Sequence, residues 1–329
     1  MNTLKPLTAA ILLASGSSLV LASGNQGYQT QYGLDNVASI DQTSNSIDNY
    51  ASQYQSGERN DAEVSQEDAT SNSAYQYQSG NDNTADIVQN DASTGNNASQ
   101  YASGTNNVAA TTQSGGSANG ASTSQNGNAN EGNIGQYYST GDQAYIYQWD
   151  ELNTAVITQA YNTGAAATIW QGYTTDDGYG ASSNGYASIY QYGQDGSTAH
   201  IEQSGNANYA NAFQYYEGAG NEAEVTQVGN SNVSYNSQYY TASSSLDVEQ
   251  RGDNNLSNVV QYEGYDLVAT VYQEGFGNSS DIDQTGDTHM ATVTQYGDSN
   301  MAVIAQTTTG NFANIFQSGT GNSGTILQN

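Results

Sequence analysis

Few side chains in this sequence are suited to acid–base or nucleophilic chemistry. The chain holds two histidines, His200 and His289, and no cysteine, too few to assemble a converging acid, base and nucleophile. His289 occupies a slot that elsewhere in the sequence holds Asn, and His200 is an isolated strand residue. Acidic residues are common, but nearly all fall at positions expected to face solvent. The sequence therefore predicts a protein that is not an enzyme and needs no cofactor.

The net negative charge of the chain limits the kinds of molecule that it is expected to bind. Arg59 and Arg251 are the only basic residues beyond Lys5, against 32 acidic residues. Nucleic-acid binding relies on Lys and Arg contacts to phosphate, so no nucleic-acid partner is expected. We interpret the acidity mainly as a source of solubility, with a response to cations as the alternative.

No metal site is predicted. Calcium-binding solenoids repeat every nine residues and place Asp in each turn. The spacing in this sequence is eleven or twelve residues, and its Asp residues are scattered. The segment Asp176-Asp177-Gly178 could hold a cation, but a single cluster is not enough to assign metal ligands.

The residues that do recur at fixed spacing are Gln and Asn, whose side-chain amides both donate and accept hydrogen bonds. One unit, Gln-x-Gly-x-x-Asn-x-Ala-x-x-x-Gln, appears in full at 31–42, 55–66, 78–89, 203–214 and 295–306. Further copies replace only the Ala, by Ser or Gly; these open at Gln125, Gln227, Gln250, Gln273 and Gln317. A conventional core is excluded, because four Phe and three Met cannot fill a domain of this length. Regular repetition must therefore specify the fold.

The repeats form two interleaved series of Gln, whose members are mostly 22 to 25 residues apart within a series. One series comprises Gln31, Gln55, Gln78, Gln100, Gln125, Gln148, Gln171, Gln203, Gln227, Gln250, Gln273, Gln295 and Gln317. The other comprises Gln42, Gln66, Gln89, Gln113, Gln136, Gln159, Gln191, Gln214, Gln238, Gln261, Gln284, Gln306 and Gln328. We call one member of each series together a rung, so each rung has two parts. Thirteen rungs predict a single repeat domain over residues 31–329.

Two rungs are irregular in this alignment. Rung four is longer by two residues between Gln100 and Gln113. Rung seven carries about nine extra residues between Gln171 and Gln191, since 20 residues separate them where 11 are usual. We expect this insertion, about 172–185, to be a surface loop.

The spacing within each unit indicates β-strands. The residue two before a closing Gln is nearly always Ile or Val, the residue four before is usually Ala, and the residue six before is often Asn. This period of two places one face inward and one outward. The Gly and Asn between strands suit turns, because both tolerate positive φ. We therefore predict an all-β solenoid, a cross-β stack of about thirteen strand-turn-strand rungs.

Stacking would satisfy the inward amides, which cost about 1–3 kcal/mol each if buried unpaired. Each Gln would lie beneath its counterpart in the next rung and form a ladder of side-chain hydrogen bonds. The predicted ladder comprises every Gln of the two series except Gln100, Gln113, Gln171 and Gln191, which bound the irregular rungs. It also includes Asn36, Asn60, Asn83, Asn130, Asn153, Asn208, Asn232, Asn255, Asn278, Asn300 and Asn322. The predicted turn glycines are Gly33, Gly57, Gly80, Gly127, Gly205, Gly229, Gly252, Gly275, Gly297 and Gly319.

The first residues have the features of a secretory signal. Residues 1–22 contain one basic residue, an apolar stretch from Leu7 to Leu21, and a small residue, Ala22, at the exit. We expect cleavage after Ala22, with residues 23–30 as a short N-terminal segment. No later segment resembles a transmembrane span, so the mature chain is expected to be secreted.

The repeat resembles the curlin repeat, in which Ser-x5 precedes Gln-x-Gly-x-Gly-Asn-x-Ala-x3-Gln. The closest local matches are Gln273-Glu-Gly275-Phe-Gly277-Asn278 and Gln317-Ser-Gly319-Thr-Gly321-Asn322. The resemblance covers essentially the whole mature chain. It implies a β-solenoid subunit that is secreted through an outer-membrane pore and nucleated at the cell surface by a minor subunit. The resemblance also implies that the subunit polymerises with itself into curli-like amyloid of the biofilm matrix, where it serves adhesion and aggregation.

The chain departs from typical curlins in several respects. It has many more rungs, is acidic and rich in Tyr, and mostly lacks the leading Ser. The nucleator of the family tends to carry a basic final repeat, whereas residues 295–328 contain no Lys or Arg. The chain therefore resembles the major subunit more closely, with the nucleator as the alternative.

A monomeric acidic solenoid that acts as an adhesin is the second alternative. Its terminal rungs should be capped by polar sequence outside the repeat, because open rungs expose unpaired backbone. The repeat pattern continues to Gln328 without such a cap, which favours polymerisation.

Overall fold

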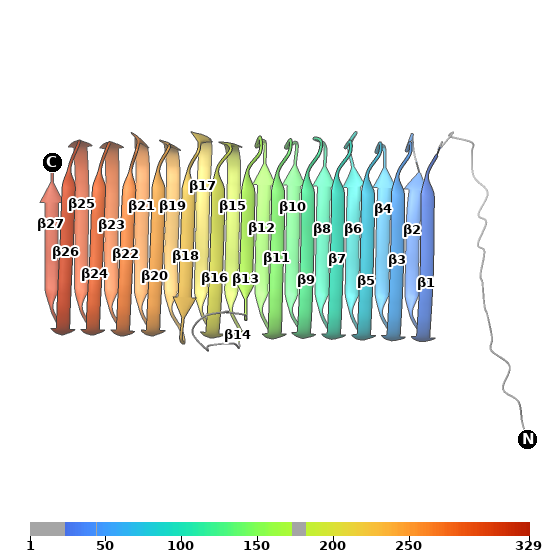
Figure 1. Ribbon diagram of the computed structural model, residues 1–329, viewed down its shortest axis with the longest axis horizontal. Coiled ribbons are helices and arrows are strands. Elements are labelled where there is room, and N and C mark those ends of the chain that lie inside the picture. The colour runs from blue at the N-terminus through green and yellow to red at the C-terminus, as the bar shows by residue number, and fades with distance from the viewer. Residues whose placement is uncertain (1–23, 44, 173–181) are drawn as a thin grey trace, which may run out of the picture.

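The computed structural model describes residues 24–43, 45–172 and 182–329, and the regular structure in these ranges is all β-strand (Figure 1). The predicted solenoid is confirmed: parallel strands stack into about thirteen rungs. The predicted signal, residues 1–22, lies outside the described residues, as do residues 173–181 of the predicted insertion loop, including Asp176 and Asp177. Within the described ranges, no helix has the length and apolar character needed to cross a membrane.

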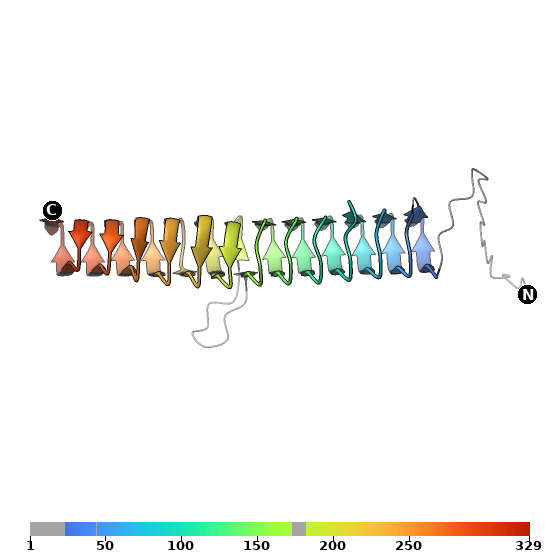
Figure 2. The same ribbon diagram turned by 90° about the horizontal axis from the view of Figure 1, so that it is seen from above.

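Each rung gives one strand to each of two sheets, which face each other along the whole stack (Figure 2). In order, the first sheet contains β1 (Gln26–Leu34), β3 (Tyr50–Glu58), β5 (Ser73–Asn81), β7 (Asn97–Thr105), β9 (Gly120–Asn128), β11 (Gln143–Glu151), β13 (Ala166–Gln171), β16 (Thr198–Asn206), β18 (Glu222–Val228), β20 (Ser245–Asp253), β22 (Val268–Phe276), β24 (Met290–Asp298) and β26 (Phe312–Thr320). The two-residue strand β14 (Ser182–Ser183) pairs with β11 and β16.

The second sheet has the same parallel order. It contains β2 (Val37–Thr43), β4 (Asp61–Glu67), β6 (Thr84–Asn90), β8 (Val108–Ser114), β10 (Glu131–Tyr137), β12 (Thr154–Ala160), β15 (Tyr186–Asp195), β17 (Tyr209–Ala219), β19 (Val233–Ala242), β21 (Leu256–Tyr265), β23 (Ser279–Asp287), β25 (Met301–Thr309) and β27 (Ser323–Gln328).

The core is a narrow layer between the sheets. Burial alternates along the strands, as in β12, where Ala155, Ile157 and Gln159 are buried and the residues between them are partly exposed. Small Ala and branched Ile or Val therefore recur in columns along the stack, with polar residues such as Thr111 and Asn236 in some rungs. Such columns need no large aromatic residues, which explains how a chain with four Phe can fold.

One register in the sequence alignment is wrong. The alignment places Gln100 between Gln78 and Gln125, but the structure pairs Ala102 with both of those residues. Gln100 instead pairs with Gln76 and Thr123. Rung four is therefore not stretched; it has the usual length and carries Ala in the Gln slot. The error arises because residues 100 and 102 lie on the same inward face of β7.

The predicted turn glycines have a backbone conformation that other residues adopt only with strain. All ten have φ between 100° and 141°. At Gly57 an added methyl group would lie 1.8 Å from the carbonyl oxygen of Gly80 in the next rung. The strands continue through nine of these glycines, and Gly229 directly follows the end of β18. The chain turns just after them. Glycine therefore permits both the positive φ and the close approach of successive rungs.

Candidate assembly site: amide ladders and open ends

The second sheet carries an unbroken ladder of thirteen glutamines, from Gln42 to Gln328. Each Nε2 donates to Oε1 of the Gln in the next rung, at 2.7–3.0 Å. Gln113 and Gln191, which the sequence interpretation left out, belong to this ladder. The donor direction is the same in every rung, so the ladder has a polarity.

The first sheet carries a parallel ladder that is interrupted once. It runs from Gln31 to Gln78 and resumes from Gln125 to Gln317, with distances of 2.7–2.9 Å between Nε2 and Oε1. Gln171, also left out of the prediction, is a member. Ala102 causes the interruption, and Gln78 donates to the backbone carbonyls of Asp61 and Asn83 instead.

The ladder amides also join the two sheets. Gln295 of β24 donates to the carbonyl of Ser279 in β23 at 3.0 Å, and Gln306 of β25 donates to that of Met290 in β24 at 3.1 Å. Each amide therefore uses donors both along the stack and across it. Because buried polar groups are stable only when paired, this arrangement allows a polar interior.

A third glutamine ladder was missed by the sequence interpretation. Gln29, Gln53, Gln76 and Gln100 stack in the first four rungs, with 2.9, 2.9 and 3.1 Å between successive amides. Thr123 follows in the same column, and from Ile146 to Ile315 the column is occupied by Ile or Val. The sequence feature that indicates this ladder is the Gln-x-Gln spacing, as in Gln29 with Gln31 and Gln53 with Gln55. This spacing places two amides on the same face of one strand.

Asparagines connect successive rungs at the corners of the stack, where the chain passes from one sheet to the other. The amide nitrogen of Asn60 donates to the carbonyl of Gly80 at 2.8 Å, and its backbone N–H donates to Oδ1 of Asn36 at 2.9 Å. The same pattern recurs in later rungs, as at Asn300, where the Nδ2 to Gly319 carbonyl distance is 2.9 Å. Asn107, omitted from the prediction, is part of this column. A second corner column, also missed, comprises Asn25, Asn49, Asn72, Asn96 and Asn119.

The two histidines differ in their surroundings. His289 is fully buried in an Asn slot, where Nδ1 accepts the backbone N–H of Asn311 at 3.2 Å and Nε2 donates to the carbonyl of Thr285 at 3.0 Å. His200 lies on the outer face of β16 beside Glu224, and burial lowers its pKa although the carboxylate opposes the change. His289 thus performs the hydrogen bonding of a corner Asn.

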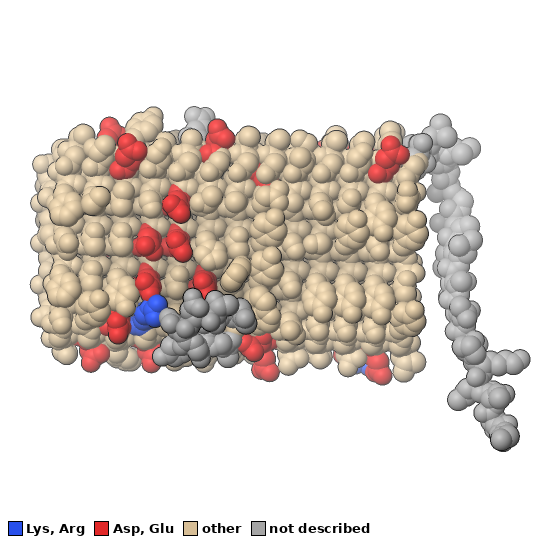
Figure 3. All heavy atoms as spheres, viewed as in Figure 1, with Lys and Arg blue, Asp and Glu red and all other residues tan. Residues whose placement is uncertain are grey.

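Acidic side chains lie in register on the outer faces. Glu63 pairs with Asp86 in the second sheet, and Glu224 pairs with Asp247 in the first. Burial, reinforced by the neighbouring carboxylates, raises the pKa of Asp86 and of Asp247. Figure 3 shows acidic side chains gathered over β18 and β20 on a face otherwise dominated by uncharged residues. Among the described residues, no group of three or more His, Asp or Glu side chains could hold a metal ion.

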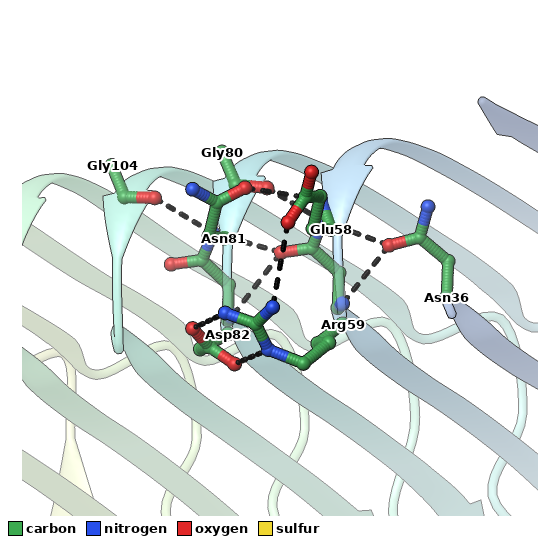
Figure 4. Close-up of polar contacts among 9 residues, drawn as sticks. Asn36, Glu58, Arg59, Gly80, Asn81, Asp82 and Gly104 are labelled. Atoms are coloured by element: carbon green, nitrogen blue, oxygen red, sulfur yellow. Dashed lines mark hydrogen bonds and ion pairs between the residues drawn. The ribbon is translucent and has the colours of Figure 1, made fainter. Parts of the chain in front are cut away.

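Arg59, which directly follows β3, forms ion pairs with two acidic side chains. Its guanidinium binds both carboxylate oxygens of Asp82 in the next rung at 2.7 Å and contacts Glu58 at 3.4 Å (Figure 4). The hydrogen bond from Arg59 lowers the pKa of Asp82. The Arg59 side chain is exposed and that of Asp82 is partly exposed, so this pair contributes little to stability.

Four strands form the ends of the stack. Within the described residues, β1 and β2 at one end and β26 and β27 at the other each pair with one neighbour in their sheet. Large apolar side chains are exposed there, including Leu34 and Val37 at the first end and Phe312, Phe316 and Leu327 at the last. Unpaired strand edges with apolar side chains are a template for adding another chain.

The polarity of the ladders makes the two ends different. Gln31 and Gln42 donate into the stack, which leaves their Oε1 atoms at the first end. Gln317 and Gln328 accept from the stack and donate one hydrogen to a backbone carbonyl. The other amide hydrogen of each, which inner rungs use for the next Gln, lies at the last end. One end therefore offers acceptors and the other offers donors.

Comparison with known proteins agrees with this geometry. The family model of the curlin associated repeat matches residues 195–229, 218–252, 264–297 and 278–307. No curated protein matches the chain. The matched segments lie in the later rungs, and the same ladders, turn glycines and register extend through the earlier ones. Residues 195–252 and 264–307 of the chain therefore contain curlin associated repeats.

Proposed function

We propose that the protein is a secreted structural subunit that polymerises end to end into curli-like extracellular amyloid fibres. The observation that carries this proposal is the complementarity of the two ends. Placing Gln31 of one copy after Gln317 of another, and Gln42 after Gln328, continues both ladders with the donor direction found within the chain. The opposite orientation would set oxygen against oxygen or nitrogen against nitrogen.

Packing at the ends supports the same conclusion. Phe316, 67% exposed, and Leu327, 65% exposed, would lose solvent contact when another rung is added. Burial of apolar surface is worth about 25 cal/mol for each Å² removed from water. The open backbone edges would gain hydrogen bonds at the same step.

The remaining parts of the proposal rest on the family. We assign the chain to the major subunit, with its export through an outer-membrane pore, its nucleation by a minor subunit at the cell surface, and a role in biofilm matrix, adhesion and aggregation. The final repeat, which contains no Lys or Arg, favours the major subunit over the nucleator.

Electron microscopy with thioflavin fluorescence tests polymerisation directly. Purified residues 23–329 should form unbranched fibres that bind the dye, after a lag that preformed fibres abolish. A chain that stays monomeric at high concentration, with the circular dichroism of β-structure, would contradict the proposal and favour a monomeric adhesin.

A further inference from the structure

A column of stacked tyrosines follows the outer face of the first sheet near its start. Tyr54, Tyr77 and Tyr101 lie in register on β3, β5 and β7. Successive ring centroids are 4.9 Å apart, and the ring planes are parallel to within 3° and 4°. Two phenols stacked in this way can reach each other through the carbon atoms ortho to their oxygens.

Solvent reaches these rings. Tyr77 is 38% exposed and Tyr101 is 43% exposed. All three rings line a surface groove of about 480 Å³, whose other walls include Ser52, Ser99 and Ser122. A soluble oxidant can therefore take electrons from the column without unfolding of the chain.

The parallel stacking stops at both ends of the column. Thr30 precedes Tyr54 in register, and Tyr32 contacts Tyr54 at 5.8 Å with its ring tilted by 52°. Ser124 follows Tyr101. Ser124 separates the column from Tyr147, whose ring contacts Trp149 and Trp170. A radical formed on Tyr77 therefore has a stacked phenol on each side as its nearest partner.

We propose that Tyr54, Tyr77 and Tyr101 form an oxidative cross-linking site at which dityrosine joins consecutive rungs. A one-electron oxidant, such as the haem of a peroxidase supplied with hydrogen peroxide, removes one electron from each of two neighbouring phenols, and each phenol releases its proton. The two radicals couple through their ortho carbons, and the hydrogens on those carbons move to the oxygens. Overall, two tyrosines and one hydrogen peroxide give one dityrosine and two waters.

The cross-link would join residues already held in register, 23 or 24 positions apart in sequence. Neighbouring rungs would then be tied by a covalent bond that reducing agents do not break. The pairs lie within one chain, so the site does not depend on polymerisation and its test is separate from the test of fibre growth.

Mapping of cross-links tests the proposal on the folded chain. The probe is tris(bipyridine)ruthenium(II) with light and persulfate, which oxidises exposed phenols one electron at a time, also in denaturant. Digestion after acidic residues separates the three tyrosines, because Glu58 lies between the first two and Asp82 between the last two. Tandem mass spectrometry should find Tyr54–Tyr77 and Tyr77–Tyr101 about tenfold or more above non-adjacent pairs, since stacking raises the effective concentration.

Two controls make the result decisive. Tyr77→Phe keeps a stacked ring but removes the oxidisable phenol, so both cross-links should disappear. The Tyr216–Tyr240 pair, stacked at 4.6 Å on β17 and β19, should still cross-link in that variant. If the folded wild-type chain gives the same distribution of pairs as the chain in guanidinium, or lacks both predicted cross-links, the proposal is overturned.

Discussion

Ala102 lies in register beneath Gln125, and Oε1 of Gln125 is buried without a hydrogen-bond donor among the described residues. For the other inner glutamines of this column, the preceding glutamine supplies that donor, as Gln125 does for Gln148 at 2.9 Å. The stack therefore contains one defect in an otherwise regular ladder, and a single substitution can repair it.

Ala102→Gln should stabilise the chain, because the new amide can accept from Gln78 and donate to Gln125. A buried hydrogen bond contributes about 0.5–1.5 kcal/mol net, and a buried unpaired acceptor costs about 1–3 kcal/mol. We expect the free energy of unfolding to rise by about 1–2 kcal/mol in denaturant titrations. Ala102→Met is the matched control, since it has a similar length and no donor; an equal gain from Met would refute the ladder explanation.

Replacing Gln295 and Gln306 by Ala should lower stability and slow fibre growth. Each change leaves the oxygen of the next Gln without its donor and removes a link to the facing strand. We expect each to cost about 1–3 kcal/mol, measured by unfolding and by elongation of fixed seeds. Tyr296→Ala, on the outer face of β24, serves as control, and a similar loss there would mean that the inward amides have no special role.

Acid should stabilise the stack and shorten the lag before fibres form. Burial and neighbouring carboxylates raise the folded-state pKa of Asp86 and Asp247 above the ordinary value of 3.8. Just above pH 3.8 the folded chain keeps protons that the unfolded chain releases, so stability falls as the pH rises through the folded-state pKa. Two like charges about 5 Å apart repel by about 1 kcal/mol even in water.

The measurement is the lag time and the free energy of unfolding between pH 7 and pH 4, at low and high salt. Asp86→Asn with Asp247→Asn should reduce the difference between the two pH values, because it removes two of the titrating groups. A lag that stays constant across this range in the wild-type chain would argue against a role for these acids in assembly.

The terminal rungs should control elongation more strongly than the middle rungs. Ile304→Lys with Ile326→Lys places charges in β25 and β27, whereas Ile157→Lys with Ile169→Lys places them in β12 and β13. Ile157, Ile169 and Ile304 are buried, and Ile326 is partly buried in the open terminal strand. Each pair should cost several kcal/mol locally, Ile326→Lys most of all once another copy covers it, since a buried unpaired charge is strongly unfavourable. We expect the terminal pair to block extension of wild-type seeds and the middle pair to permit partial extension. Equal inhibition would leave a uniform stack without specialised ends.

The sequence predicted much of this architecture, because the solenoid has a period of two within strands and of about 23 residues between rungs. Columns such as Ile157 with Gln159 are visible in the sequence, since both periods coincide there. Rung four was misaligned because residues 100 and 102 share one face, so residue type alone could not choose between them. The spacing of Gly104, Ala109 and Gln113, which matches that of Gly80, Ala85 and Gln89 in the preceding rung, distinguishes the two registers.

The corner columns were harder to predict. Asn49 and Asn72 stand before Tyr50 and Ser73, which begin strands, and their side chains bond to the backbone of neighbouring rungs. The spacing Asn-x-Ala, present at both sites, is the signal that could have found them. The raised pKa of Asp86 could not be read from the sequence, because it depends on how far the outer face buries a carboxyl group.

The change of the inner column from Gln29 to Ile315 has a mechanical consequence. When copies join end to end, the amide at the start of one chain meets an aliphatic side chain at the end of another, so this column cannot continue across the joint. Every joint is then a seam that is weaker than the interior of a subunit. Under shear, such a fibre should fracture at seams, and every fragment should expose the same pair of ends as a single chain.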